Sequence, residues 1–185
     1  SAASDVYKRQ SLDEVRNMRI LTTNLLNLAR RDDGINPQWT DLDAQFFDTI
    51  FKNYQLVVEE SGKVFRSDNQ VNRILKMDKA LLKQLMTILV DNAIKYTDKN
   101  GVVEIKVKTT DKTLLISVID NGPGIKDEEK KKIFDRFYRV DKARTRQTGG
   151  FGLGLALAQQ IVTSLKGSIT VKDNFPKGSI FEVKL

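Results

Sequence analysis

Residues 120–125, with the sequence Asp-Asn-Gly-Pro-Gly-Ile, combine a carboxylate with a glycine-rich turn and could bind a flat ring. The preceding residues 114–119 form an apolar, β-branched run that predicts a buried strand, so Asp120 would stand on rigid backbone where this strand ends. A carboxylate there can accept a hydrogen bond from an exocyclic amine such as adenine N6, and Gly122 and Gly124 let a ring approach the backbone closely. Alone, this hexapeptide is more typical of an ordinary turn, so its interpretation depends on its neighbours.

A second group of side chains lies on a helix that the apolar periodicity predicts over residues 79–96. Asn92, Lys95 and Tyr96 occupy positions i, i+3 and i+4 and therefore project from one side of it. The amide oxygen of Asn92 can ligate Mg²⁺, which keeps several waters when it binds a phosphate chain. Lys95 can place a point charge on phosphate oxygens, and Tyr96 can pack on a purine or close a pocket. By itself, a solvated Asn-Lys pair at a helix end is the simpler interpretation.

A third group is the glycine-rich run at residues 149–154, which opens another apolar helix. Successive backbone N–H groups at a helix N-terminus can bind an anion, and glycine lets phosphate oxygens reach them. The run is not a P-loop, because no Lys-Ser or Lys-Thr pair follows its last glycine. It also lacks the immediately preceding strand of a dinucleotide-binding fold. A flexible hinge is the alternative interpretation.

Between the two glycine-rich stretches, residues 126–146 carry nine Lys or Arg against five Asp or Glu. This excess of four positive charges is more than half of the chain's formal net charge of +7. Phe134, Phe137 and Tyr138 interleave the charges. A basic segment flanked by glycines is typical of a lid over a nucleotide, with nucleic-acid binding as the competing interpretation.

Composition excludes several other classes of site. The 185 residues include no cysteine, which excludes disulfides, thiol nucleophiles and cysteine metal sites. They also include no histidine, the commonest general base and zinc ligand. No apolar run approaches the roughly 20 residues that cross a bilayer. The pI of about 9.5 suits a polyanionic partner, and the length suits one domain with an appendage or two small domains.

The hydrophobic patterns predict mixed helices and strands, with the helices on one face of a mixed sheet. Residues 1–10 show no period and are interpreted as an added remnant or a disordered end. Residues 11–32 are predicted as a helix with Ser11 as its N-cap, followed by a linker at 33–41. The remaining predicted elements are helices at about 42–58, 79–96 and from 151 or 152 to 166, a short helical piece at 133–134, and strands at 64–66, 71–75, 102–109, 114–120, 168–171 and 180–185.

The order of these motifs resembles that of the catalytic and ATP-binding domain of bacterial two-component sensor histidine kinases, within the gyrase, Hsp90 and MutL ATPase superfamily. Residues 91–97 are similar to its N box, 120–125 to its first glycine box, 133–139 to its F box and 150–155 to its second glycine box. Residues 178–179, Gly-Ser, resemble the closing motif whose hydroxyl helps to hold the adenine pocket.

The resemblance is strong over residues 42–185, which it implies to be the catalytic ATP-binding domain. Residues 11–32 resemble, more weakly, the second helix of the dimerisation and phosphotransfer hairpin. The implied fold is an α/β two-layer sandwich of the Bergerat type, with three helices on a mixed sheet and one long helix before it. The implied cofactors are ATP and Mg²⁺.

The resemblance also implies roles for individual residues. Asn92 would ligate Mg²⁺ and, with Arg139 and Arg144, act catalytically at the phosphates. The implied nucleotide-binding residues are Asn92, Lys95, Tyr96, Asp120, Gly122, Gly124, Ile125, Phe137, Gly150, Gly152, Leu153, Gly154 and Ser179.

Two features depart from the family pattern. Ile88 lies four residues before Asn92, on the same helical face, where many relatives carry Glu, Asn or His. In the ATPase branches a Glu at that place activates the attacking water, whereas Ile88 can neither abstract a proton nor ligate a metal. A neutral imidazole already offers a lone pair, so Ile88 is compatible with transfer to histidine and argues against an ATPase or a serine kinase. The second departure is the absent histidine, from which we expect the chain to be a fragment.

Together these features predict the catalytic part of a sensor histidine kinase, which transfers the γ-phosphoryl group of Mg-ATP to a histidine outside this chain for relay to a cognate response regulator. The resemblance further implies a homodimer in the full-length protein and a cytoplasmic position in a membrane-anchored bacterial sensor. Two alternatives stay open, a non-catalytic nucleotide-binding module and a basic nucleic-acid-binding protein. We expect no specific nucleic-acid binding, only a weak and salt-sensitive attraction.

Overall fold

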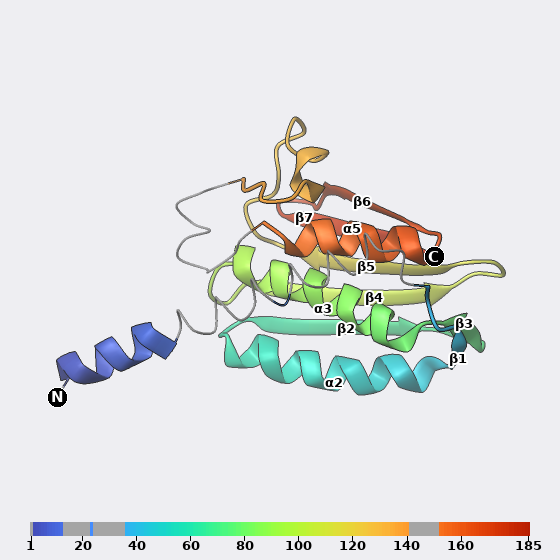
Figure 1. The fold of residues 1–185 in the computed structure, drawn as a ribbon, viewed down its shortest axis with the longest axis horizontal. Helices are drawn as coiled ribbons and strands as arrows, with labels where there is room; N and C mark the ends of the chain where they lie inside the picture. Colours follow the sequence, from blue (N-terminus) through green and yellow to red (C-terminus); the bar gives the residue numbers. More distant parts are fainter. Residues whose placement is uncertain (1, 13–22, 24–35, 141–151) are drawn as a thin grey trace.

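A mixed five-stranded sheet forms one layer of the chain in a computed structural model, which describes residues 2–12, 23, 36–140 and 152–185 (Figure 1). Its spatial order is β2-β4-β5-β7-β6. The strands are β2 (Val64–Gln70), β4 (Val102–Thr109), β5 (Leu114–Asp120), β6 (Ser168–Asp173) and β7 (Ser179–Lys184). β2 runs parallel to β4, and every other neighbouring pair is antiparallel. The predicted mixed sheet is therefore confirmed.

The alternation of buried and exposed residues along β5 determines where its last side chain points. Leu114, Ile116 and Val118 are buried, and so is Asp120 at the end of the same series. Val103 of β4 is the Cα partner of Asp120 and is also fully buried. Because side chains at every second position share one face of a sheet, Asp120 is a carboxylate on the core face.

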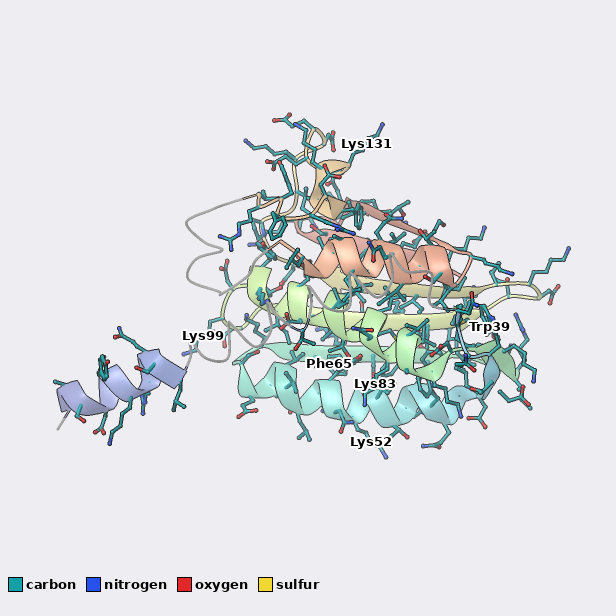
Figure 2. All side chains as sticks on the ribbon, viewed as in Figure 1. Trp39, Lys52, Phe65, Lys83, Lys99 and Lys131 are labelled. Atoms are coloured by element: carbon teal, nitrogen blue, oxygen red, sulfur yellow. The ribbon has the colours of Figure 1, made fainter. Side chains whose placement is uncertain are left out.

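Three helices cover one face of the sheet (Figure 1). They are α2 (Ala44–Glu60), α3 (Lys79–Tyr96) and α5 (Gly154–Ser164). α3 matches the predicted range of 79–96, and its apolar stripe includes Leu82, which is fully buried. The polar side chains lie on the outside of this layer, as Figure 2 shows for Lys52 on α2. The second layer of the predicted sandwich is therefore confirmed.

Aspartates begin two of these helices. Asp43 accepts a hydrogen bond from the backbone N–H of Gln45, and Asp78 accepts one from that of Leu81 at 3.0 Å. A side-chain acceptor at this position satisfies an N–H group that the first helical turn leaves unpaired. The cap explains why α2 begins at Ala44, two residues after the predicted start.

Short elements differ most from the prediction. A strand was predicted at residues 71–75, but β3 occupies Leu75–Met77 and pairs antiparallel with β1 (Thr40–Leu42). β1 was not predicted, and it begins inside the predicted linker at residues 33–41. Three-residue strands are too short to leave a periodic pattern. Conversely, β2 continues to Gln70, four residues beyond the predicted end.

The ends of two helices also differ. Residues 2–12 are helical, whereas we predicted a remnant or a disordered end at residues 1–10. Ser11 lies inside this helix rather than at the N-cap of the helix predicted at 11–32. The stretch contains good helix formers and neither glycine nor proline. α5 begins at Gly154 because Gly152 has a left-handed φ of +72°. Most of the predicted helix at 11–32, together with residues 33–35, lies outside the described residues.

None of the described helices combines the length and the apolarity needed to cross a bilayer.

The core packing generates a first prediction. Leu82 is fully buried, whereas Leu56 on α2 is 67% exposed. We expect Leu82→Ala to lower the free energy of unfolding by about 3 kcal/mol, because it removes buried methyl groups and leaves a cavity. The matched control Leu56→Ala should change it by less than about 0.5 kcal/mol. Urea unfolding followed by circular dichroism measures both, and equal losses would contradict the assigned core.

Candidate functional site

Asp120 is the buried carboxylate of the site, with 4% of its surface exposed. Its Oδ1 accepts hydrogen bonds from the backbone N–H groups of Gly122 at 2.9 Å and Ser179 at 3.3 Å. In the part of the chain that the structure describes, both bonds go to Oδ1, which leaves Oδ2 as an acceptor for a ligand. Burial raises the pKa of the Asp120 carboxyl, and the two hydrogen bonds oppose that shift in part.

Three backbone segments meet closely around this carboxylate. A Cβ atom at Gly122 would overlap the carbonyl oxygen of Tyr96, at the end of α3. A Cβ at Gly178 would overlap the carbonyl oxygen of Asp120, and Gly178 also has a left-handed φ of +108°. Asn174 donates a side-chain hydrogen bond to the same Asp120 oxygen at 2.9 Å. Glycine is therefore required at both positions, for space at Gly122 and for space and conformation at Gly178.

A first cavity of about 760 Å³ opens beside Asp120. Its walls come from the end of α3, the turn after β5, residues 126–140 and the loop between β6 and β7. Six of the predicted site residues line it: Asn92, Tyr96, Asp120, Gly124, Ile125 and Ser179. Its volume lies within the usual range for a pocket that holds a small organic ligand.

A second cavity of about 560 Å³ continues along α3 toward the start of α5. Seven of the predicted site residues line it: Asn92, Lys95, Tyr96, Arg139, Gly152, Leu153 and Gly154. Asn92 and Tyr96 border both cavities, so the two form one elongated site. Lys95 stands at the second cavity and forms an ion pair with Asp91 at 2.9 Å.

The two ends of this elongated site differ in chemistry. The first contains the Asp120 carboxylate, which accepts hydrogen bonds. The second contains Lys95 and Arg139 together with the N-terminus of α5. Leu153 is the N-cap of α5 and carries no acceptor that could cap its first N–H groups. The arrangement suits a ligand with an amine donor at one end and an anion at the other.

Ile88 lies on the same side of α3 as Asn92, as predicted, since both line the second cavity. Its Cγ2 atom would be 3.4 Å from a Cβ atom added at Gly154. Ile88 therefore presents hydrocarbon where α3 faces the start of α5, and no proton acceptor.

Some predicted residues are not placed in either cavity. Phe137 is 59% exposed and lines neither, whereas the neighbouring Tyr138 lines both. Phe137 has a φ of +64°, and its N–H donates to the carbonyl of Gly152 at 2.9 Å. Gly122 also lines neither cavity and contributes its backbone N–H to Asp120 instead. Arg144 and Gly150 lie outside the described residues.

Residues 173–178 of the β6–β7 loop form one wall of the first cavity. Of these, only Gly178 belongs to a motif that the sequence indicated, and residues 173–177 were not predicted. The loop reaches the site because Asp120 and Ser179 are Cα partners in the β5–β7 ladder. No local pattern indicates such a pairing between residues so distant in sequence. Ser179 contacts Asp120 through its backbone N–H. The role of its hydroxyl in holding the adenine pocket stays a prediction.

Comparisons with known proteins agree with this geometry. The family profile described as "Histidine kinase-, DNA gyrase B-, and HSP90-like ATPase" matches residues 77–185, more than half of the chain. The sensor protein CiaH of Streptococcus pneumoniae serotype 4 is 62% identical over 175 residues, which are 95% of this chain and 39% of CiaH. The signal transduction histidine-protein kinase ArlS of Staphylococcus aureus is 45% identical over 112 residues, 60% of this chain and 25% of ArlS. The chain thus spans well under half of either relative.

Among solved structures, full-length ShkA in complex with AMPPNP matches this chain with a TM-score of 0.80. The match covers 95% of this chain and 36% of ShkA at 23% sequence identity, and it is a likeness of fold.

The raised pKa of Asp120 predicts opposite effects of Asp120→Asn on stability and on binding. The Asp120 carboxyl has a higher pKa in the folded than in the unfolded chain. The free energy of unfolding therefore falls as the pH rises through the folded pKa, because the folded chain then carries a buried charge. The amide oxygen can still accept from Gly122 and Ser179, so at pH 7 the variant should unfold at an equal or higher urea concentration than wild type. The difference in stability between the variant and wild type should shrink as the pH falls toward about 4, the pKa of an aspartate in an unfolded chain. Affinity for an adenine nucleotide should fall at least about tenfold.

Asp111→Asn, in the exposed turn between β4 and β5, is the matched control and should change neither quantity. Calorimetric titration and urea unfolding at several pH values measure the two effects. A variant clearly less stable than wild type at pH 7 would contradict the assigned cost of the buried charge.

Proposed function

The chain belongs to the histidine kinase-, DNA gyrase B- and HSP90-like ATPase family, and we propose that it is the ATP-binding catalytic part of a sensor histidine kinase. The observation that carries the proposal is the elongated site, with a buried carboxylate at one end and an uncapped helix N-terminus with two basic side chains at the other. Adenosine triphosphate has the matching distribution of groups, an exocyclic amine on the base and a chain of anions.

At the base end, Asp120 accepts the hydrogen bond of the adenine amine through Oδ2. The carboxylate can keep a fixed orientation because Gly122 and Ser179 hold Oδ1. Gly124 and Ile125 border the same cavity and provide its backbone and apolar surfaces. This distribution favours adenine over guanine, whose carbonyl at the corresponding position would meet a carboxylate oxygen without a proton between them.

At the phosphate end, Lys95, Arg139 and the first N–H groups of α5 bind the phosphates. Asn92 stands where the two cavities meet, so its amide oxygen fits a metal ion held between the protein and the phosphate chain. Mg²⁺ bound there would neutralise charge on the phosphate oxygens. Arg144 and Gly150, by the family resemblance, complete this end of the site.

The acceptor of the phosphoryl group is proposed to be a histidine on another polypeptide segment, because the 185 residues contain none. Transfer to an imidazole nitrogen needs positioning and charge stabilisation more than a base. Ile88 is consistent with that requirement, since its hydrocarbon side chain cannot deprotonate a water molecule beside the phosphates. Lys95 and Arg139 are the described residues that meet the charge on the transferring group.

The role in the whole protein is also a proposal, because the chain spans 39% of CiaH and 25% of ArlS. Their printed names, sensor protein and histidine-protein kinase, support a signalling kinase that passes its phosphoryl group to a response regulator. We further propose that the whole protein is a homodimer and is anchored in the membrane, with this part in the cytoplasm.

Metal-dependent nucleotide binding tests the assignment of Asn92. Asn92→Ala should weaken ATP binding at least about tenfold when Mg²⁺ is present and much less in EDTA, because it removes one metal ligand. Asn53→Ala is the matched control, because Asn53 lies on α2 and lines only the second cavity. Calorimetry in the two buffers separates the effects, and an equal loss in both would remove Asn92 from the metal site.

Phosphoryl transfer tests the kinase activity itself. With γ-labelled ATP, the chain alone should not label itself, but an added helical hairpin that carries a phosphoacceptor histidine should become labelled. The product should be stable to base and labile to acid, as a phosphoramidate is. Arg139→Ala should slow labelling by about tenfold or more while changing ATP affinity less, if the guanidinium meets charge that develops during transfer. Arg66→Ala, on the exposed face of β2, is the control.

Rapid ATP hydrolysis by the chain, with no labelling of any hairpin tried, would make an ATPase the better assignment. Tight ATP binding with neither activity would instead favour a non-catalytic nucleotide-binding module.

A further inference from the structure

Two walls of the first cavity come from distant parts of the chain and are joined by an ion pair. One wall is residues 126–140 and the other is the β6–β7 loop, residues 173–178. Figure 2 labels Lys131 on the first of these walls, on the segment drawn above β6 and β7. Neither wall contains a long helix or strand, so their separation depends on the contacts between them.

One ion pair joins the two walls. The ammonium nitrogen of Lys130 lies 2.8 Å from Oδ1 of Asp173, where β6 ends. Lys130 also bonds Asp127 within its own wall. The Lys130 side chain is only 19% exposed, although its two partners are largely exposed. Both carboxylates hold the pKa of the Lys130 ammonium above its usual range, and the hydrogen bond that Lys130 donates to Asp127 contributes most to this shift.

Other contacts fix each wall separately. The loop is attached to the floor of the cavity, because Asn174 donates to the Asp120 carbonyl and its own N–H donates to the carbonyl of Gly178 at 3.0 Å. The opposite wall is attached at its base, where the Phe134 ring packs edge-on against Phe181 of β7 with centroids 6.3 Å apart.

Within that wall, a hydrogen bond joins two of its own side chains. The Tyr138 hydroxyl donates to Glu129 at 2.9 Å, and both residues line the first cavity. This bond keeps Tyr138 against the segment that carries Lys130. A displacement of Lys130 would therefore move two side chains that line the cavity.

We propose that Lys130 and Asp173 form a clasp that keeps these two walls of the first cavity at the separation that fits the adenine base, and that both are positioning residues for ATP. This inference rests on the proposed function, because it assigns the first cavity to the base. Because the Asp173 carboxylate is 68% exposed, water screens the pair and it contributes little to global stability. The pair should instead raise the affinity for the nucleotide. Because the walls are already joined, binding does not incur the entropy cost of ordering them.

The structure offers two matched controls for the clasp. Lys130 and Asp127 are three residues apart in the sequence and belong to the same wall, so this pair does not join the two walls. The Lys172–Glu182 pair, at 3.1 Å, joins β6 to β7 beside the clasp, and neither residue lines the cavity. Removing either pair deletes an ion pair of the same kind without separating the walls.

The test is a double-mutant cycle on the full chain, with Mg-ATP and Mg-ADP affinities measured by calorimetry. Asp173→Asn and Lys130→Gln should each weaken both nucleotides by about three- to tenfold. The loss should be equal for ATP and ADP, because the clasp acts at the base end. The double variant should bind no more weakly than either single variant. Asp127→Asn and Lys172→Gln should stay within twofold of wild type.

The urea midpoints should not move for any of these variants, because ion pairs with a solvent-exposed partner contribute little to global stability. Affinities of Asp173→Asn and Lys130→Gln within twofold of wild type, or losses that simply add in the double variant, would overturn the clasp while leaving the proposed function intact. A wild-type chain with no measurable affinity for either nucleotide would overturn the proposed function and the clasp together.

Discussion

The site depends on one buried carboxylate whose position is set by the pairing of β5 with β7. Asp120 occupies the last core-facing place on β5, and Ser179, its partner in the ladder, donates its backbone N–H to the carboxylate. A charged group in such a place lowers stability unless its hydrogen bonds are satisfied. The two backbone donors compensate part of that cost, and Oδ2 remains for a ligand. The Asp120 carboxylate is therefore a group that lowers the stability of the fold but is available to a ligand.

The glycines around Asp120 follow from the same constraint. The turn after β5 and the start of β7 both approach it backbone to backbone, and no side chain fits at Gly122 or Gly178. Close approach removes water from the carboxylate and leaves a flat surface beside it. Gly122 and Gly178 are therefore needed for packing, in addition to the part that the glycine box is proposed to play in binding.

Helix α3 connects the two ends of the site. Its buried stripe packs on the sheet, while Asn92, Lys95 and Tyr96 project at its other side, where the two cavities meet. A rigid helix keeps Asn92, the proposed metal ligand, and the cation of Lys95 at a fixed distance from the cavity proposed for the base. Ile88 on the same face presents hydrocarbon rather than a proton acceptor, which is consistent with the proposed transfer to an acceptor that brings its own lone pair.

The local chemistry of this protein was predictable from its sequence, because helical periodicity, strand alternation and glycine spacing act over neighbouring residues. The bounds of α3 and β4 follow from such patterns. Eleven residues of the elongated site were named from the motifs and from the family resemblance that these motifs carry. The tertiary structure alone decided which strands pair, and so brought the β6–β7 loop, with Asp173, across from Lys130. It also decided that Tyr138 rather than Phe137 lines the cavities. Long-range pairing depends on the register of the whole sheet, and no short segment of sequence encodes it.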